Sequence, residues 1–212
     1  MMFTFPNPLY AIDDTLGRAE LSFLDLAEQL CAGGARLIQL RAKDLSSREL
    51  LTLAQQVQAV CRHHGCLLII NDRVDIALAV DADGVHVGQE DLPLAAARKV
   101  LGPHKIVGVS THDPAQAQAA ERDGADYIGF GPVFGTTTKA TGYSARGLEQ
   151  LREIRSRVRL PIVAIGGITT TRAPATLGAG ANAVAMISDL VLASDVAKKV
   201  QETLAMLQAR ET

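Results

Sequence analysis

The sequence predicts an α/β protein that forms a single-domain (β/α)8 TIM barrel, and three observations lead to this fold class. The chain has 212 residues, of which 48% are hydrophobic, and this is enough to bury one large core. Eight short apolar runs recur along it, with helix-period segments between them, as in repeated βα units. No linker or low-complexity tract divides the chain. We therefore expect residues 1–212 to form one barrel domain.

The eight predicted strands are short, and most are followed by polar or glycine residues. They lie near Leu9–Ile12, Arg36–Arg41, Leu67–Asn71, Gly84–Val87, Ile106–Ser110, Tyr127–Phe130, Ile162–Ile165 and Ala183–Ile187. A doubly wound open sheet is the competing fold, but it usually carries a glycine-rich phosphate loop after its first strand. No glycine pair follows the first run, where Ile12 leads into Asp13, Asp14 and Thr15. This difference favours the barrel.

Helix starts are recognisable between the strands. Glu49 follows Ser46 by three residues, which is the capping-box pattern. Asp113 precedes Pro114, which places a capping carboxylate before a proline at the first helical position. After Ser46, apolar residues at helical spacing predict one buried face, made by Leu50, Leu53, Val57 and Val60.

Composition limits the partners and the compartment. The 21 basic and 23 acidic residues give a net charge of -2, so no broad basic field is available for nucleic acid or an anionic membrane. Cys31, Cys61 and Cys66 are too few for a disulfide framework, and we expect buried thiols. The first ten residues lack a basic segment followed by an apolar run. We expect a cytoplasmic protein that binds small molecules.

The segment from Tyr127 to Lys139 is the most informative part of the sequence. A short apolar strand leads into glycines and then into hydroxyl and ammonium groups at Thr136, Thr137, Thr138 and Lys139. Glycines let backbone N–H groups approach an anion, and the side chains add donors and charge. A plain glycine and threonine turn is the alternative.

Two cations and an amide share one face at the end of the second predicted strand. Side chains two apart along a strand point the same way, so Gln39, Arg41 and Lys43 are expected to point together. Ile38 and Leu40 are then expected to face the helices. The polar cluster suits a polyanion, and the alternative is an exposed strand end held by surface ion pairs.

Carboxylates end two consecutive units of the predicted barrel. Asp72 follows the third predicted strand, and Asp91 follows the fourth. Carboxylate oxygens from one or two side chains, completed by water and phosphate, are the usual ligands of Mg²⁺. The alternative is that each aspartate caps the helix that follows it. Their position beside the cationic cluster favours a Mg²⁺ site.

A second anion site is predicted after the last two strands. Gly166 and Gly167 follow the seventh run, and Ser188 follows the eighth. Barrels often bind a phosphate at these two loops, on backbone N–H groups and a helix N-terminus. The alternative is a tight strand-to-helix turn. Two separate anion sites in one mouth suit a diphosphate ester together with a monophosphate.

The histidines carry little signal. His86 and three others are expected to have structural roles. His112 is the exception, because it follows Ser110 at the end of the fifth predicted strand, where a general acid or base could act.

These motifs occur in a fixed order along the chain: Gln39–Lys43, Asn71–Arg73, Gly84–Asp91, Gly108–Ser110, Gly129–Phe134, Thr136–Lys139, Ala164–Ile168 and Ile187–Ser188. Together they resemble the thiamine-phosphate synthase (thiamine-phosphate pyrophosphorylase) family, over residues 8–190. The resemblance implies a barrel transferase of thiamine biosynthesis. Such an enzyme couples hydroxymethylpyrimidine diphosphate to thiazole phosphate by a Mg²⁺-assisted dissociative substitution, and releases diphosphate.

The resemblance also implies roles for particular residues. Those implied to bind the pyrimidine diphosphate are Gln39, Leu40, Arg41, Ala42, Lys43, Asn71, Ser110 and Lys139, with Lys43, Ser110 and Lys139 catalytic. Those implied to hold the thiazole phosphate are Thr136, Thr137, Thr138, Gly167, Ile187 and Ser188. Asp72 and Asp91 are the implied Mg²⁺ ligands.

Three other functions compete with this one. A thiazole tautomerase would bind thiazole phosphate and use a base such as His112, but it needs neither metal ligands nor a second anion cluster. A catalytically silent phosphate-binding protein could share the barrel, since fold does not fix function. A generic phosphate-binding barrel isomerase would likewise have no use for the paired aspartates.

Overall fold

Parallel strands close into a barrel in the computed structural model, which describes residues 3–135 and 144–209. The strands follow one another in sequence order, and the barrel closes because β1 pairs with both β2 and β8. The strands are β1 (Leu9–Asp13), β2 (Leu37–Leu40), β3 (Leu67–Asn71), β4 (Gly84–Val87), β5 (Ile106–Thr111), β6 (Tyr127–Phe130), β7 (Ile162–Ala164) and β8 (Ala183–Met186). The predicted barrel and its eight strands are confirmed, with ends that differ by one residue in five of them.

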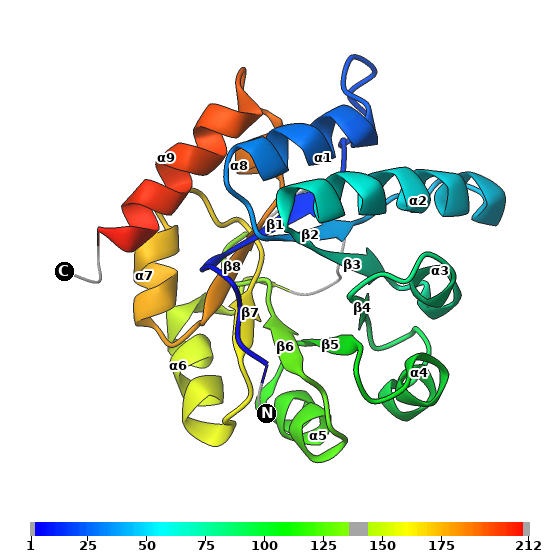
Figure 1. Ribbon diagram of the computed structural model, residues 1–212. Coiled ribbons are helices and arrows are strands. Elements are labelled where there is room, and N and C mark those ends of the chain that lie inside the picture. Colours follow the sequence, from blue (N-terminus) through cyan, green and yellow to red (C-terminus); the bar gives the residue numbers. More distant parts are fainter. Residues whose placement is uncertain (1–2, 136–143, 210–212) are drawn as a thin grey trace.

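Helices surround the barrel and cover its outer face (Figure 1). They are α1 (Phe23–Ala32), α2 (Ser47–His64), α3 (Val74–Ala79), α4 (Leu94–Leu101), α5 (Pro114–Arg122), α6 (Gly147–Arg157), α7 (Ala173–Gly178), α8 (Ser188–Val191) and α9 (Val196–Gln208). Both predicted helix starts are confirmed. Ser46 and Glu49 form the capping box of α2, and the Asp113 carboxylate accepts a hydrogen bond from the Gln116 N–H at 2.8 Å.

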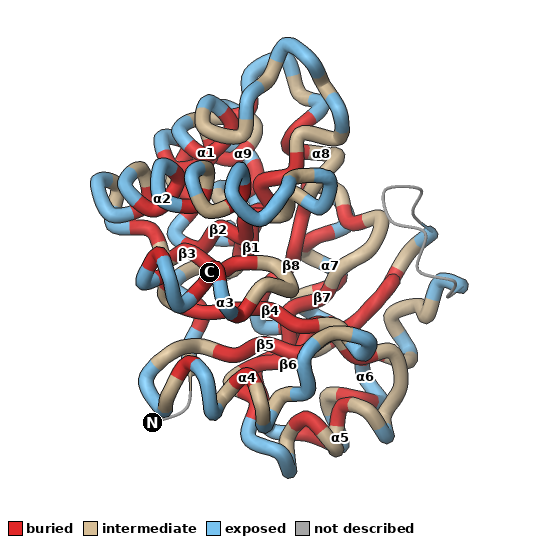
Figure 2. Tube along the Cα trace, turned by 90° about the vertical axis from the view of Figure 1, so that its right-hand side faces the viewer, coloured by how far each residue is buried: buried red, intermediate tan, exposed pale blue. Residues whose placement is uncertain are grey.

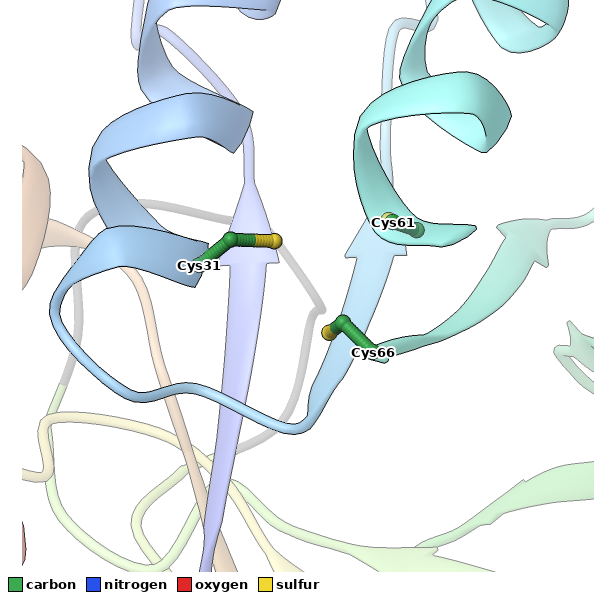
Figure 3. A group of neighbouring side chains, drawn as sticks. All are labelled: Cys31, Cys61 and Cys66. Atoms are coloured by element: carbon green, nitrogen blue, oxygen red, sulfur yellow. The ribbon is translucent and has the colours of Figure 1, made fainter. Parts of the chain in front are cut away.

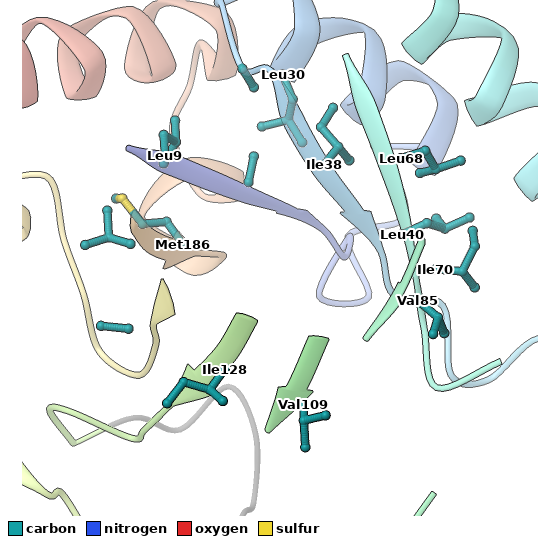
Figure 4. Close-up of a cluster of buried hydrophobic side chains, with 14 of the residues drawn as sticks. Leu9, Leu30, Ile38, Leu40, Leu68, Ile70, Val85, Val109, Ile128 and Met186 are labelled. Carbon is teal, nitrogen blue, oxygen red and sulfur yellow. The ribbon is translucent and has the colours of Figure 1, made fainter. Parts of the chain in front are cut away.

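The main core lies between the strands and the helices (Figure 4). Leu9 and Ala11 of β1 point outward into this layer, whereas Tyr10 and Ile12 point into the barrel. This alternation follows from the strand period of two. Figure 2 shows the result as buried strands inside helices that are exposed on their outer sides.

The buried face of α2 is shifted slightly from the predicted one. Leu50 and Val57 are buried as expected, but Leu53 and Val60 are only partly buried. Ala54 and Cys61 complete the buried face instead. Small residues at these two positions let the helix lie close to the barrel.

Aromatic rings fill the amino end of the barrel. Phe5 packs against Tyr127 with ring centroids 5.4 Å apart, and the chain before β1 lies across this end of the barrel (Figure 1). Tyr10 and Tyr127 are buried in the same layer. Gly108 is required beneath Tyr127, because a Cβ there would lie 2.1 Å from the Tyr127 ring. In the described part of the chain, the barrel interior therefore opens toward the carboxyl ends of the strands.

Two expectations from composition can be compared with this structure. Cys31, Cys61 and Cys66 are buried and free, as predicted. Among the helices of the described residues, none combines the length and the apolar character that crossing a bilayer requires.

Candidate active site

A pocket opens at the carboxyl ends of the strands, and every strand contributes to its lining. One lining residue from each of β1 to β8 is Tyr10, Gln39, Asn71, His86, Ser110, Gly129, Val163 and Ala185. A second pocket adjoins it and shares Asn71 and Asp72. The two pockets form one continuous polar mouth.

The described site residues predicted from the sequence all line this mouth. The first pocket contains Gln39, Arg41, Asn71, Asp72, Ser110, Gly167, Ile187 and Ser188. The second contains Leu40, Ala42, Lys43 and Asp91, together with the shared pair. The predicted Thr136, Thr137, Thr138 and Lys139 lie outside the described residues.

The cations that follow β2 are held by carboxylates inside the mouth. The Arg41 guanidinium is paired with the Asp14 carboxylate, and the Lys43 ammonium lies 2.9 Å from a carboxylate oxygen of Asp72. The Arg41 side chain is only 17% exposed, so a surface ion pair is the wrong description of its contact. Leu40 packs outward with the main core, as predicted. Each cation is therefore positioned before a ligand arrives.

Asp72 and Asp91 lie together and cap no helix. The N-cap residues of α3 and α4 are Arg73 and Pro93, so neither aspartate occupies a capping position. The capping alternative is therefore wrong for both aspartates. Burial raises the pKa of Asp91, a hydrogen bond from the Gly88 N–H at 2.7 Å opposes this effect, and the neighbouring Asp72 carboxyl raises that pKa further. Two neighbouring carboxyl groups, one of which raises the pKa of the other, are a fitting donor set for a divalent cation.

The backbone at Asp72 is itself unusual. Its φ of 61° lies in the left-handed region, which few residues other than glycine adopt. The Asp72 N–H donates to the His86 carbonyl at 2.8 Å. Such a conformation persists where the surrounding structure holds it, often at functional sites.

A chain of hydrogen bonds crosses the pocket floor. Gln39 Nε2 donates to the Tyr10 hydroxyl at 2.8 Å, which lies 2.9 Å from the Tyr127 hydroxyl. The Tyr127 hydroxyl lies 3.0 Å from His86 Nδ1, and His86 Nε2 lies 2.9 Å from Ser110 Oγ. Burial raises the pKa of both tyrosines, so both hydroxyls stay protonated. One network thus orients the two predicted ligand contacts, Gln39 and Ser110.

Sequence reasoning missed most of this network. It gave His86 a structural role and did not consider Tyr10 or Tyr127 as site residues. Strand alternation was the available signal, because Tyr10 and Ile12 point to the same face of β1. Ile12 pairs with Gln39 of β2, so Tyr10 also faces the interior near Gln39.

The opposite side of the mouth is built from backbone. Gly166 and Gly167 have φ values of +102° and +60°, and a Cβ at Gly167 would lie 2.4 Å from the Gly135 carbonyl oxygen. The Phe134 N–H donates to the Gly166 carbonyl at 3.0 Å, which holds the two loops together. The short helix α8 begins at Ser188, and no side chain caps it. Gly166, Gly167 and Ser188 line the pocket at the place where the sequence predicts a phosphate.

Arg172 lies behind the glycine loop, and His112 lines the pocket. The Arg172 guanidinium donates to the Gly167 carbonyl at 2.7 Å and lies 4.8 Å from the centre of the Phe134 ring. Sequence reasoning missed Arg172, because it follows no strand directly. His112 lines the pocket, and its Nδ1 lies 2.7 Å from the Gly131 carbonyl oxygen, which fixes the ring.

A closed (β/α)8 barrel whose strands bring polar groups to one mouth defines a barrel enzyme that acts on small polar molecules. The family model for thiamine monophosphate synthase matches residues 9–190. The chain belongs to this family, and it is a transferase of thiamine biosynthesis.

Individual relatives agree with this assignment. A thiamine-phosphate synthase of Moorella thermoacetica is 51% identical over 174 residues, which cover 82% of this chain and 83% of that protein. A thiamine-phosphate synthase of Chloroflexus aurantiacus is 44% identical over 206 residues, covering 96% of this chain and 94% of that protein. The solved structure of a thiamine phosphate pyrophosphorylase from Pyrococcus furiosus superposes with a TM-score of 0.87 at 37% identity, covering 96% of both chains. The predicted family and activity are confirmed.

Proposed function

We propose that this chain joins hydroxymethylpyrimidine diphosphate to thiazole phosphate, forming thiamine phosphate and releasing diphosphate. The observation that carries the proposal is that one mouth holds two regions of unlike construction, each suited to an anion. Charged side chains follow β2, β3 and β4, whereas a glycine loop and the start of α8 follow β7 and β8. A single phosphate needs one such region, and a diphosphate ester with a monophosphate needs both.

Asp72 and Asp91 would hold Mg²⁺ in this proposal. The two carboxyl groups are close enough to affect each other's ionisation, which makes them a suitable pair of oxygen donors. When bound, the ion supplies charge neutralisation for the diphosphate group. Arg41, Lys43 and Asn71 line the same region and would bind the diphosphate oxygens.

The chain's own residues would bind and orient two substrates. Gln39 and Ser110 would contact the pyrimidine from the floor network. Leu40 and Ala42 would contribute through the backbone that carries the cations. Gly167, Ile187 and Ser188 would hold the thiazole phosphate. The family resemblance adds further residues to both substrate sites. It assigns Thr136, Thr137 and Thr138 to the thiazole phosphate and Lys139 to the pyrimidine diphosphate.

The proposed substitution is dissociative. The bond from the pyrimidine methylene carbon to the diphosphate oxygen breaks first, and diphosphate keeps the electron pair. The thiazole nitrogen then donates its lone pair to that carbon and forms the new bond. Lys43, Ser110 and Lys139 would stabilise the departing group, so the protein's work is positioning, charge stabilisation and exclusion of water. No nucleophilic side chain is required.

The tautomerase alternative is weaker because of the same residues. Moving a proton on thiazole phosphate would leave the aspartate pair and the Arg41 and Lys43 cations without a role. We also propose a cytoplasmic location and small-molecule partners. The net charge of -2 supports the absence of nucleic acid among the partners. Assembly into a homo-oligomer stays a prediction.

The test is diphosphate release by the purified protein. Release should require both substrates and Mg²⁺, should stop with EDTA, and should match thiamine phosphate in amount. Saturable binding of thiazole phosphate without any release would contradict the proposal and favour the tautomerase or a silent binding protein.

A further inference from the structure

Three cysteine side chains from separate segments meet between the barrel and its first two helices (Figure 3). Cys31 lies near the end of α1, Cys61 lies in the last turn of α2, and Cys66 follows that helix. Their Sγ atoms all lie within 4.8 Å of one another, and all three residues are buried and free. The chain contains only these 3 cysteines. Every thiol of the protein is therefore gathered at one point.

The local backbone brings two of these thiols together. Gly65 adopts φ +64° at the end of α2, and this turn lets the Cys66 N–H donate to the Cys61 carbonyl at 2.8 Å. Four residues separate Cys61 from Cys66, a spacing found between ligands of protein zinc sites. Bonds of about 2.3 Å place thiolates on one ion roughly 3.7–4.0 Å apart. A contraction of less than about 1 Å would therefore close the site around an ion.

The surroundings of the cluster favour one thiolate, at Cys31. Hydrogen bonds from the thiols of Cys61 and Cys66 lower the pKa of Cys31 to about 4. The same hydrogen bonds to Cys31 raise the pKa of Cys61 and of Cys66. The positive charge of Arg36 favours the thiolate form of both Cys31 and Cys66. Three thiolates with a divalent ion carry one net negative charge, which the nearby Arg36 can offset. The same three thiolates with a monovalent ion would carry two net negative charges.

We propose that Cys31, Cys61 and Cys66 form a binding site for one soft divalent metal ion, with Zn²⁺ as the physiological ion. Thiolate ligands select such ions over Mg²⁺, which prefers the oxygen ligands at Asp72 and Asp91. Binding one Zn²⁺ to a thiolate and two thiols forms three Zn–S bonds and releases two protons to solvent. No oxidant is involved, because sulfur keeps its oxidation state.

The site would act on stability and leave the reaction unchanged. The helix ends that carry Cys31 and Cys61 lead into the amino ends of β2 and β3, whereas the active-site pocket lies at the carboxyl ends. A bound ion would link α1, α2 and the segment entering β3. Because the ion binds the folded chain preferentially, it should raise the unfolding temperature.

Cadmium titration of the metal-free, reduced protein tests the proposal directly. Cd²⁺ bound to thiolates absorbs in the ultraviolet, whereas Cd²⁺ on carboxylates does not. We expect this absorption to saturate at one ion per chain and Zn²⁺ to displace it. Cys66→Ala should weaken Cd²⁺ binding by at least about 100-fold. Loss of a group that only hydrogen-bonds to a metal ligand already lowers metal affinity about 10- to 100-fold, and this variant loses a ligand itself.

Val158→Ala is the matched control. Val158 is buried at the end of α6, before β7, and its truncation removes two methyl groups, more volume than the one sulfur lost in Cys66→Ala, from an equivalent position of another unit. It should lower the unfolding temperature and leave Cd²⁺ affinity unchanged. If Cys66→Ala does not fold, Cys66→Ser replaces it.

Two results would overturn the site. One is a wild-type protein without thiolate absorption at equimolar Cd²⁺. The other is absorption that Cys66→Ala and Cys31→Ala leave unchanged. Either result would mean that the three thiols only pack against one another. Diphosphate release in Mg²⁺ should be the same with and without bound Zn²⁺ at the cluster, which separates this test from the test of the proposed function.

Discussion

The two sides of the active-site mouth, each of which we propose binds an anion, are built by different means. The side at β2 to β4 uses charged side chains, namely Arg41, Lys43, Asp72 and Asp91. The side at β7 and β8 uses backbone at Gly166, Gly167 and the start of α8. A site made of side chains fails when atoms are removed, whereas a site made of backbone fails when atoms are added. The mutations that test each side must therefore run in opposite directions.

The largest effect is expected from deletion on the charged side. Asp72→Ala removes one proposed Mg²⁺ ligand and the partner of Lys43. We expect kcat to fall about 100- to 1,000-fold, which is typical when one group that stabilises developing charge is lost. Steady-state diphosphate release across a Mg²⁺ titration measures it.

Asp75→Ala is the control for that deletion. Asp75 lies three residues after Asp72, is exposed, lines neither pocket, and pairs with Arg73. Its replacement should leave turnover unchanged. Full activity of Asp72→Ala at limiting Mg²⁺ would show that the metal assignment is wrong.

The next largest effect is expected from addition on the backbone side. Gly167→Val places a side chain against the Gly135 carbonyl and fills the proposed phosphate cradle. We expect KM for thiazole phosphate to rise about 10- to 100-fold, as for loss of one or two charge-assisted hydrogen bonds. KM for the pyrimidine diphosphate should stay nearly constant.

Gly17→Val separates crowding from backbone strain. Gly17 has φ +74°, but a Cβ there meets nothing within 4 Å. Both variants should lose stability, and only Gly167→Val should lose affinity for thiazole phosphate. Equal changes in both KM values would mean that Gly167 acts through the fold alone.

A smaller effect is expected at the floor that lies between the two sides. Tyr127→Phe keeps the ring and removes the hydroxyl that links Tyr10 to His86. The remaining groups lose a buried partner, so the free energy of unfolding should fall by about 1–3 kcal/mol. A loss of orientation at Ser110 should lower kcat by about 10-fold. Urea unfolding and initial rates measure the two effects, and unchanged kcat would show that the network does not orient Ser110.

The smallest effect is expected from a carboxyl that belongs to neither side. Asp13 is fully buried, and neither of its oxygens has a hydrogen-bond partner among the described residues. Burial is the main reason why its pKa lies well above 3.8. Below pH 3.8 the carboxyl is protonated in both states. As pH rises from there, the unfolded chain loses this proton while the folded chain keeps it, so the folded state becomes less stable.

Asp13→Asn removes this dependence on pH. The variant should gain stability over the wild type as pH rises from 4 to 8. Urea unfolding at both pH values checks the difference. A difference that is the same at pH 4 and pH 8 would contradict a protonated Asp13.

The strands and the charged side were predictable from sequence, because both depend on local patterns. Apolar runs define the strands, and a residue that follows such a run lies at the mouth whatever the rest of the chain does. Gln39, Arg41 and Asp72 were found in this way. The same logic found Gly167 and Ser188.

The floor network and the cysteine cluster depend on contacts between distant segments. The hydroxyls of Tyr10 and Tyr127 meet although 117 positions separate them. Cys31 joins Cys61 and Cys66 only because α1 packs beside α2. Tyr10, Tyr127 and Cys31 look like ordinary core residues in the sequence, so no local pattern distinguishes them.

The aromatic layer under the pocket also limits where substrates and products can enter and leave. Phe5, Tyr10 and Tyr127 seal the amino end, so substrates and products share the same entrance. A ligand that contacts Gln39 and Ser110 at the bottom lies beneath any ligand held at the rim by Gly167 and Ser188. On the substrate positions proposed above, we expect the deeper ligand to enter first. A closed amino end would thus make the two substrates load in sequence through one entrance.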